Sequence, residues 1–369
     1  MNRVRSSTLI ALQLGTMLLV AMHVAAQTPS PALLVLEKSD NTLAVVDPAK
    51  LQVVARVPAG EDPHEVIASD DGKLAYISNY GGEGSTLNTI SVVDLVAQKA
   101  LHPIDLGALH SPHGLAMGGG ELYFTAETSK VIGRYDPRTQ RIDWVLGTGQ
   151  DRTHMIVVSK SLGQIVTSNV SSGTVSIIEQ IARQTSTLSP PPGADRRPGP
   201  PPSSVGAGSR KSWVVTNVPA GKGSEGIDVS PDGKEIWVAN AQDGTITIID
   251  AASKNVTQTV PISVKGANRL KFTPDGKQAL VSGLGGRSAS STSSGGDLAV
   301  LNVALRKEVK LLNLGGGSAG ILVAPDGGRA YVAVSASGNI AVVDLKTLQV
   351  IHQISAGNRP DGLAWAVRK

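Results

Sequence analysis

The sequence predicts an all-β protein, a seven-bladed β-propeller made of four-stranded antiparallel blades. A unit of about forty residues returns along the chain, as in repeat architectures. Each unit holds short apolar runs separated by Asp-Gly or Gly-Gly pairs, which supply the positive φ angles of hairpin turns. The 41 glycines and 21 prolines, without a long amphipathic helical pattern, favour strands joined by many turns.

The first apolar run of each unit and the hairpin behind it can be aligned along the chain. Clear examples are PHEVIASDDGKLAYISN and SEGIDVSPDGKEIWVAN, in which the turn fixes the register of the two strands. Many runs are continuous rather than alternating, as expected when both faces of a sheet are covered. Successive units begin at Pro63, Pro112, Thr153, Ser224, Ala267, Ser318 and Pro360.

A polar residue ends the third run of every unit, and this position gives the number of blades. We expect its side chain to accept backbone N–H bonds at the following turn. The N-terminal unit lacks a first strand, whereas DGLAWAV at the C-terminus is spare, so pairing the two would close the ring and remove its open edges. The seven positions are Asp47, Asp94, Asp136, Glu179, Asp250, Asn302 and Asp344.

Units that contain PDGKEIWVAN, IAVVD and a trailing ISAG resemble the YVTN-type propeller repeats of exported bacterial and archaeal proteins, from Ala32 to the end of the chain. The unit SPHGLAMGGGELYFTAETSKVIGRYD is also similar to streptogramin B lyase and its relatives. Both resemblances imply the seven-bladed fold. They imply an activity only weakly, because many functions occur on this scaffold.

The N-terminus predicts a secretory signal. Arg3 and Arg5 precede an apolar stretch that ends before the small residues VAA, which are typical of a cleavage site. Polar residues interrupt the stretch, and a membrane anchor would need about 18 apolar residues without interruption. We therefore expect a signal peptide over residues 1–26, no membrane anchor, and one mature propeller domain over 27–369 that is periplasmic or secreted and monomeric.

Composition excludes several classes of function. Without cysteine the chain has no disulfide, thiolate metal site or cysteine nucleophile. Loss of the signal lowers the formal charge from +4 to +2, and aromatic residues make up only 3%, so no nucleic-acid partner is expected. The motifs of phosphate-binding loops, HExxH metalloproteases, GxSxG hydrolases and c-type cytochromes are all missing from the sequence.

Three stretches interrupt the repeat. Residues 186–211, STLSPPPGADRRPGPPPSSVGAGSRK, are too rich in Pro, Gly and Ser to bury much apolar surface, so we expect a disordered surface loop. Shorter stretches, YGGEGSTLN from Tyr80 and GLGGRSASSTSSGG from Gly283, both follow a second strand. Their shared place in the repeat puts them on one face of the disc, where they could form a rim or lid.

One repeat position, the residue before the first apolar run, carries the candidate site. First strands line the central channel of a propeller, so these seven residues should circle one mouth of it. Imidazoles from consecutive blades and a carboxylate could together hold one divalent metal ion, such as zinc, manganese, iron or copper. The predicted metal ligands are His64, His113, His154 and Glu225, and the predicted ligand-binding residues add Asn268 and Asp361. Ala319 completes the ring.

Two interpretations of the three histidines stay open. They could simply form hydrogen bonds to loops of neighbouring blades across a wet channel entrance. They could also form a ligand site, which their clustering favours, because they are three of only seven histidines in the chain and a channel mouth is a usual place for a ligand.

Other polar and aromatic positions have simpler expected roles. Three asparagines that end second strands are expected to bond neighbouring blades, and four aromatic residues at one repeat position should pack between blades. Glu37 and Glu127 could supply acid/base chemistry, but nothing in the sequence distinguishes them. The asparagines are Asn79, Asn169 and Asn240, and the aromatic residues are Tyr76, Tyr123, Trp237 and Tyr331.

The sequence thus leads first to an exported propeller that binds a small molecule or a partner protein at its channel face. A first alternative is a metal-dependent lyase or lactone hydrolase that uses the histidine cluster. A second is a redox protein with a non-covalent haem or a quinone in the funnel, as related propellers imply.

Overall fold

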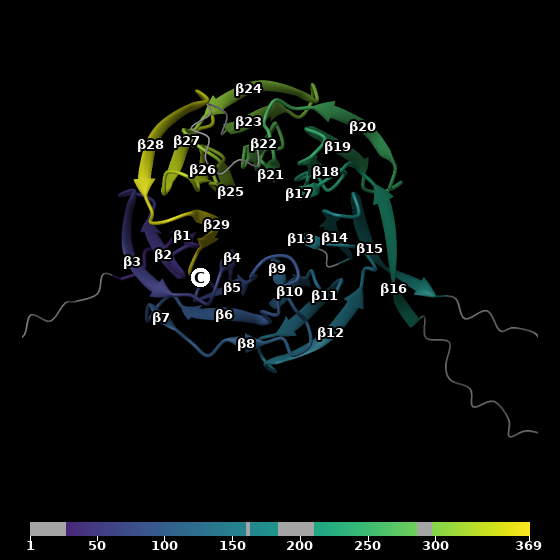
Figure 1. Cartoon of the computed structure of the whole chain (residues 1–369), viewed down its shortest axis with the longest axis horizontal. Helices are drawn as coiled ribbons and strands as arrows, with labels where there is room; N and C mark the ends of the chain where they lie inside the picture. Colours follow the sequence, from purple (N-terminus) through teal and green to yellow (C-terminus); the bar gives the residue numbers. More distant parts are fainter. Residues whose placement is uncertain (1–26, 160–162, 184–209, 286–296) are drawn as a thin grey trace, which may run out of the picture.

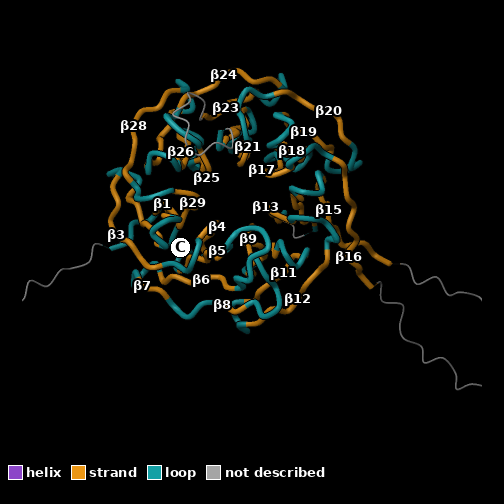
Figure 2. Tube along the Cα trace, viewed as in Figure 1, coloured by secondary structure: helices purple, strands orange, loops and turns teal. Residues whose placement is uncertain are grey.

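The chain forms a ring of seven blades around a central channel (Figure 1), and this confirms the predicted β-propeller. The computed structural model describes residues 27–159, 163–183, 210–285 and 297–369, and every regular element in those ranges is a β-strand (Figure 2). Within each blade the first strand lies nearest the axis and the fourth lies at the rim. No helix among the described residues is long and apolar enough to cross a membrane.

The strands follow the repeat, and in every blade they succeed one another from the channel outward. Blades 1 to 3 are β29 (Pro360–Ala366), β1 (Ala32–Glu37), β2 (Thr42–Asp47) and β3 (Gln52–Pro58); β4 (Pro63–Ala68), β5 (Leu74–Asn79), β6 (Thr89–Asp94) and a split outer strand, β7 (Lys99–Ala100) and β8 (Ile104–Asp105); β9 (Pro112–Gly118), β10 (Glu121–Ala126), β11 (Val131–Asp136) and β12 (Arg141–Gly147). Blades 4 and 5 are β13 (Thr153–Val158), β14 (Gln164–Asn169), β15 (Thr174–Arg183) and β16 (Arg210–Pro219); β17 (Ser224–Val229), β18 (Glu235–Asn240), β19 (Thr245–Asp250) and β20 (Val256–Pro261). Blades 6 and 7 are β21 (Ala267–Phe272), β22 (Gln278–Gly283), β23 (Asp297–Asn302) and β24 (Lys307–Asn313); β25 (Ser318–Val323), β26 (Arg329–Val334), β27 (Asn339–Asp344) and β28 (Gln349–Ser355).

The ring closes in blade 1, where the two ends of the chain share a sheet. Strand β29 pairs antiparallel with β1, and Leu34 lies opposite Ala364. Beside this pair, the Asn358 backbone N–H and side-chain amide donate to the carboxylate of Asp40 at 3.0 and 2.9 Å. The predicted pairing of the C-terminal strand with the N-terminal unit is therefore confirmed.

Adjacent blades pack through apolar cores, and the predicted aromatic position lies in these interfaces. The rings of Trp237 and Phe272 lie 5.2 Å apart between blades 5 and 6, and those of Tyr331 and Trp365 lie 5.4 Å apart between blades 7 and 1. Trp237 is fully buried, and burial of a large side chain stabilises the fold by about 1.5–3 kcal/mol. The aromatic residues therefore have the predicted packing role.

The polar residue predicted to end the third strand caps the next turn in six of the seven blades. Asp47 Oδ1, for example, accepts the N–H of Ala49 at 2.9 Å, and Asp344 Oδ1 accepts that of Thr347 at 2.7 Å. Glu179 differs, because its carboxylate binds Lys254 Nζ at 2.6 Å instead. The architectural role predicted for these residues is confirmed at six positions, which are Asp47, Asp94, Asp136, Asp250, Asn302 and Asp344.

The predicted signal peptide over residues 1–26 lies outside the described residues. Most of the 186–211 insertion also lies outside them, but its last two residues, Arg210 and Lys211, begin β16 and so are not part of a loop. Immediately after the predicted cleavage site, Thr28 is buried and its hydroxyl donates to the Leu95 carbonyl at 2.5 Å.

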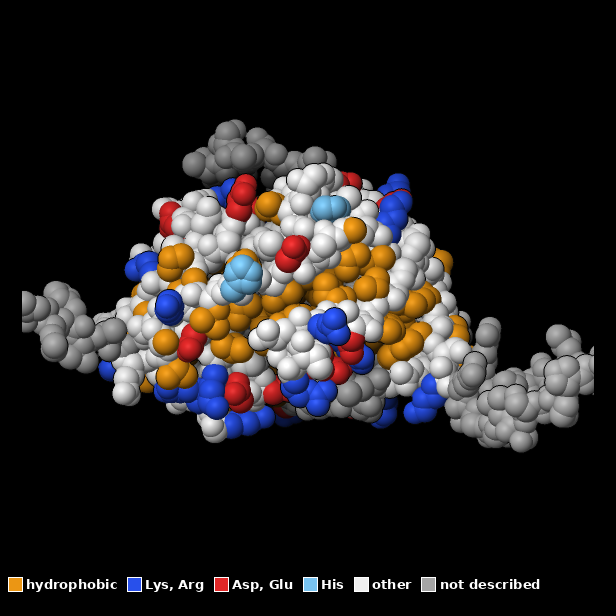
Figure 3. Space-filling view, turned by 90° about the horizontal axis from the view of Figure 1, so that it is seen from below, with side chains coloured by type: hydrophobic (Ala, Val, Ile, Leu, Met, Phe, Trp, Pro, Cys, Tyr) orange, Lys and Arg blue, Asp and Glu red, His pale blue; other side chains and the backbone are white. Residues whose placement is uncertain are grey.

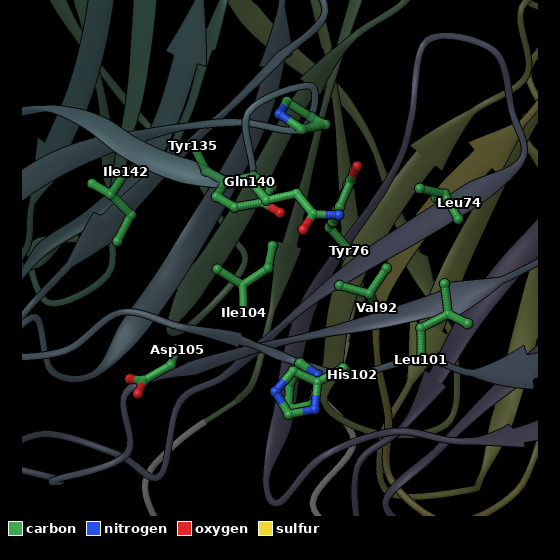
Figure 4. A pocket seen from close by; sticks show the side chains of 12 residues that line it. Leu74, Tyr76, Val92, Leu101, His102, Ile104, Asp105, Tyr135, Gln140 and Ile142 are labelled. Atoms are coloured by element: carbon green, nitrogen blue, oxygen red, sulfur yellow. The ribbon is translucent and has the colours of Figure 1, made fainter.

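A groove of about 530 Å³ lies on the outer wall between blades 2 and 3. Its lining is largely apolar and includes Tyr76, Ile104 and Tyr135 (Figure 4). Hydrophobic side chains also gather on this side of the molecule in the space-filling view (Figure 3). The groove lacks the clustered ionisable groups found at the channel mouth, to which we therefore assign the candidate site.

Candidate functional site

A β-bulge at the predicted ring position aims seven side chains toward the channel. In blade 2, Pro63 lies opposite Asn79 and Val66 opposite Ile77, so that His64 and its neighbour face a single residue of β5. Such a bulge bends the strand and redirects its side chains. The register shifts at the same place in every blade.

Hydroxyl groups on the second strands hold these bulges in place. Thr125 Oγ1 accepts the N–H of Gly114 at 2.8 Å and donates to the carbonyl of His154, in the next blade, at 2.7 Å. Ser168 Oγ repeats this pattern, because it donates to the Glu225 carbonyl at 2.6 Å. The backbones of His154, Glu225 and Ala319 are thus fixed by the blade before them.

The residue before the first strand adopts a positive φ in six of the seven blades. Blades 5 and 6 use glycine there, whereas other blades carry Asp62 (φ 46°), Ser111 (φ 55°), Arg152 (φ 53°) and Arg359 (φ 51°). A residue other than glycine in this left-handed region is destabilised sterically by about 1 kcal/mol. Two of these residues reach charged groups of the mouth, since Asp62 lies 3.4 Å from Lys38 Nζ and Arg152 lies 3.7 Å from Glu127.

The three predicted histidines lie together. The ring centroids of His64 and His113 are 4.4 Å apart, and the rings of His113 and His154 stack at 3.6 Å. The Tyr80 ring, at 4.8 Å from His113, covers the same group. His113 is completely buried, and neither of its ring nitrogens has a hydrogen-bond partner in the part of the chain that the structure describes.

Glu127 joins the cluster from the residue after β10. Its Oε1 accepts a hydrogen bond from His154 Nδ1, and its Oε2 accepts one from the Tyr80 hydroxyl at 2.5 Å. Burial opposes the charge on both partners, yet their mutual attraction outweighs it: the pKa of Glu127 is lowered and the pKa of His154 is raised. Arg152 Nε lies 3.7 Å from Glu127 Oε2.

His64 faces a different set of charges, on blade 1. Its Nδ1 lies 3.1 Å from Asp361 Oδ2 and contacts Lys38 Nζ. Burial and the Lys38 ammonium hold the pKa of His64 well below its usual value, so the ring is neutral. Burial raises the pKa of Asp361 to about 6 against the opposing effect of Lys38.

Glu225 and Asn268 continue the polar ring on blades 5 and 6. Glu225 Oε1 accepts a hydrogen bond from Asn268 Nδ2 at 2.7 Å and lies 3.5 Å from His154 Nε2. One residue further along the first strands, Arg269 of blade 6 pairs with Glu65 of blade 2 and links two blades that are not neighbours. Six of the seven predicted positions thus carry polar side chains, whereas the seventh, Ala319, is apolar and buried.

The structure brings together two of the four metal ligands predicted from the sequence and adds a third residue to them. The donor atoms that cluster are those of His113, His154 and Glu127, all within 4.8 Å of one another. His64 is directed to Asp361 and Lys38 instead. Glu225 lies near only one of the clustered ligands, at 3.5 Å from His154 Nε2. Two imidazoles and one carboxylate form a known ligand set of catalytic zinc and of non-haem iron, so the residues present fit a divalent transition metal.

Several residues of the site were not singled out by the sequence. Tyr80, Glu127 and Lys38 all occupy one repeat position, the residue that follows a second strand, on blades 2, 3 and 1. The equivalent residues Val170, Ala241, Leu284 and Ser335 are apolar or small. Comparison of this position between units is the signal that could have found them.

Two other expectations are corrected. Glu37 is fully buried away from the histidines, where it binds Arg56 and the Thr42 hydroxyl, so it is a structural residue. The strand-ending asparagines bond within their own blades: Asn79 Nδ2 donates to Thr89 and Ser91 at 2.8 and 3.0 Å. Asn169 and Asn240 bind the next strand of their own blade in the same way.

Comparison with known proteins shows the fold. The chain matches no protein-family model and no curated protein. A protein of unknown function from Desulfotomaculum acetoxidans is 12% identical with a TM-score of 0.69, over 92% of this chain and 100% of that one. A protein from Bacteroides uniformis, provisionally assigned as a 6-phosphogluconolactonase, is 14% identical with a TM-score of 0.67, over 91% and 99%.

A third similar structure is the dihydro-haem d1 dehydrogenase NirN in complex with DHE. It is 15% identical, with a TM-score of 0.58 over 88% of this chain and 63% of that one. Identities this low establish shared architecture, and the resemblance to YVTN repeats stays a prediction. The chain is a seven-bladed β-propeller whose structural neighbours include proteins of lactonase and haem d1 dehydrogenase type.

Proposed function

We propose that the channel mouth binds a small molecule through one divalent transition-metal ion held by His113, His154 and Glu127. The observation that carries the proposal is His113, whose two ring nitrogens are buried beside the other two ligands and have no hydrogen-bond partner among the described residues. A buried polar group without a partner costs about 1–3 kcal/mol. A bound ion would take one of these nitrogens as a ligand.

The charge of the mouth supports a cationic occupant. Carboxylates outnumber ammonium and guanidinium groups among the paired side chains of the mouth, and Glu127 and Glu225 both approach His154. The paired carboxylates are Asp62, Glu65, Glu127, Glu225 and Asp361, and the paired cations are Lys38, Arg152 and Arg269. An ion bound there would lower the repulsion between the carboxylates.

Each residue of the mouth has a distinct task in this proposal. Tyr80 orients Glu127 through its hydroxyl, and Asn268 orients Glu225. Such partners fix the direction of ligand groups at metal sites. When bound, the ion supplies Lewis-acid chemistry, which polarises an oxygen of the small molecule.

A metal-dependent lyase or lactone hydrolase is the second candidate. It is favoured by the Tyr80 hydroxyl, an O–H donor hydrogen-bonded to Glu127 and packed against His113. A structural neighbour assigned provisionally as a lactonase has the same fold. Hydrolysis of a panel of lactones by the zinc- or manganese-loaded protein, absent in a Tyr80→Phe variant, would support it.

The redox alternative has less support from the geometry. His113 and His154 stack at 3.6 Å, which leaves no room for a flat macrocycle between their rings. A visible absorbance spectrum of the purified protein tests the presence of haem directly.

We also propose export, with cleavage before Gln27. Anchoring of Thr28 immediately after this point supports the proposed boundary. The mass of the exported protein tests it, since a chain that retains residues 1–26 contradicts cleavage.

Thermal melting in the presence of metal tests the proposed function. Zinc or manganese should raise the melting temperature of the tag-free protein, and His113→Ala should abolish the shift. His352→Ala is the matched control, because this histidine is exposed on the outer strand β28. A melting temperature that stays the same with every divalent ion added would contradict the proposal.

A further inference from the structure

Arg152, like His113, is a residue of the mouth whose polar groups are not all paired. It belongs to the loop before β13, and its side chain is 25% exposed. Its Nε atom is buried and has no hydrogen-bond acceptor among the residues that the structure describes. The nearest carboxylate oxygens, of Glu127 and Glu83, lie 3.7 and 3.9 Å away, beyond hydrogen-bond distance.

Neither carboxylate accounts for this arginine. Glu127 already accepts hydrogen bonds from His154 and Tyr80, one on each oxygen. Glu83 is 71% exposed, and a pair with so exposed a partner contributes little. The guanidinium also interacts with the Tyr80 hydroxyl, but its Nε–H is left without an acceptor among the described residues at the edge of the histidine cluster.

The backbone conformation at Arg152 is shared by most blades at this repeat position. Its φ is +53°, in the left-handed region, and Arg359 of blade 1 has a φ of +51°. The conformation therefore does not distinguish Arg152. Its place does, because its Nε lies 3.7 Å from Glu127 Oε2, beside the histidine cluster.

We propose that Arg152 binds the carboxylate of the small molecule held at the channel mouth, so that the ligand class is a small carboxylic acid, such as a hydroxy acid. This inference rests on the proposed function, since it adds a second anchor to the ligand of the same site. The planar guanidinium fork matches a carboxylate in two parallel hydrogen bonds, which an ammonium cannot do.

The chain offers a matched control for Arg152. Arg359 occupies the same repeat position in blade 1, also with a positive φ of 51°, but its side chain is exposed. Arg359→Gln therefore changes charge and residue type equally, away from the histidine cluster. Arg152→Lys keeps the charge and removes the fork.

The experiment measures the melting temperature of the zinc-loaded protein over a range of glycolate concentrations, with ethylene glycol as the uncharged probe. We expect glycolate, but not ethylene glycol, to stabilise the wild type and the Arg359→Gln variant. Arg152→Gln should need at least about tenfold more glycolate than the wild type for the same rise in melting temperature, while its zinc affinity stays within about threefold of the wild-type value. The glycolate concentration that Arg152→Lys needs should lie between those of the wild type and Arg152→Gln.

Equal responses of Arg152→Gln and wild type to glycolate, or equal effects of glycolate and ethylene glycol, would overturn the inference. So would a large loss of zinc affinity in Arg152→Gln, because Arg152 would then act through Glu127. If the wild type takes up no zinc, the proposed function fails separately. Glycolate binding by the metal-free protein, lost in Arg152→Gln, would still support the role of Arg152, and its absence would refute it.

Discussion

Two arcs of the same ring differ in what they place at the channel. Blades 2 to 4, the histidine arc, present imidazoles at the ring position, whereas blades 6 and 7 of the opposite arc present Asn268 and Ala319. After the second strand, the histidine arc has Tyr80 and Glu127 on two of its blades, and the equivalent residue of blade 6 is Leu284.

The backbone that carries these residues is the same in both arcs. The Thr125 hydroxyl binds the His154 carbonyl in one arc, and the Ser282 hydroxyl binds the Ala319 carbonyl, at 2.5 Å, in the other. The repeat therefore places equivalent residues at equivalent points of the channel in both arcs. The two arcs differ in the side chains at these points, which are ionisable in the histidine arc and mostly apolar or uncharged in the opposite arc. Variants at matched positions test this contrast.

The largest expected effect is on metal affinity, and it separates two neighbouring glutamates. Glu127→Gln should lower zinc affinity by more than about 100-fold, because it removes a ligand. Glu225→Gln should lower it by only about 10- to 100-fold, the range typical of residues that support ligands. Zinc titration in competition with a chelator measures both. A larger loss of zinc affinity in Glu225→Gln than in Glu127→Gln would indicate that Glu225 is the carboxylate ligand, as the sequence predicted.

A pH-dependent change in stability is expected from Asp361, which joins the two arcs in blade 1. Its pKa is about 6 in the folded chain and near 3.9 when unfolded. The folded state holds the proton more tightly, so this contribution is complete below about pH 4 and is lost as the pH rises through about 6. It amounts to no more than about 3 kcal/mol.

Urea unfolding of the wild type and Asp361→Asn from pH 4 to 7 measures this contribution. The wild type should lose stability relative to the variant as the pH rises. A constant difference between the two proteins would show that the carboxyl group has an ordinary pKa in the folded chain.

The smallest expected effect concerns the hydroxyl groups that tie neighbouring blades in the two arcs. Thr125→Val and Ser282→Ala each remove one such buried hydroxyl, so each should destabilise the fold by about 1–2 kcal/mol. Only Thr125→Val should also weaken zinc binding, because the freed carbonyl belongs to His154. Equal effects of the two variants on zinc affinity would mean that the arcs are not functionally distinct.

The ring and its mouth were predictable because both follow from a repeat. Alignment of the units places His64, His113 and His154 on consecutive blades without any knowledge of long-range contacts. The turn-capping role of residues such as Asp47 also follows from local spacing, since its partners are two and three residues away.

The finer chemistry of the site depends on contacts between distant segments. Glu127 and Tyr80 are 47 residues apart, and although they share a repeat position, the repeat does not show that their side chains form a hydrogen bond. The pair of Glu65 and Arg269 spans 204 residues and crosses between non-adjacent blades. The sequence also could not show that His64 and His113 have different surroundings, because Lys38 contacts His64 from another blade.

Anomalous diffraction from crystals grown with zinc, recorded on both sides of the zinc absorption edge, would locate the proposed ion without relying on any variant. A single peak about 2.0–2.2 Å from donor atoms of His113, His154 and Glu127 is the predicted result. Crystals whose histidine arc shows no anomalous density, or whose peak lies on His64 and Asp361 instead, would contradict it.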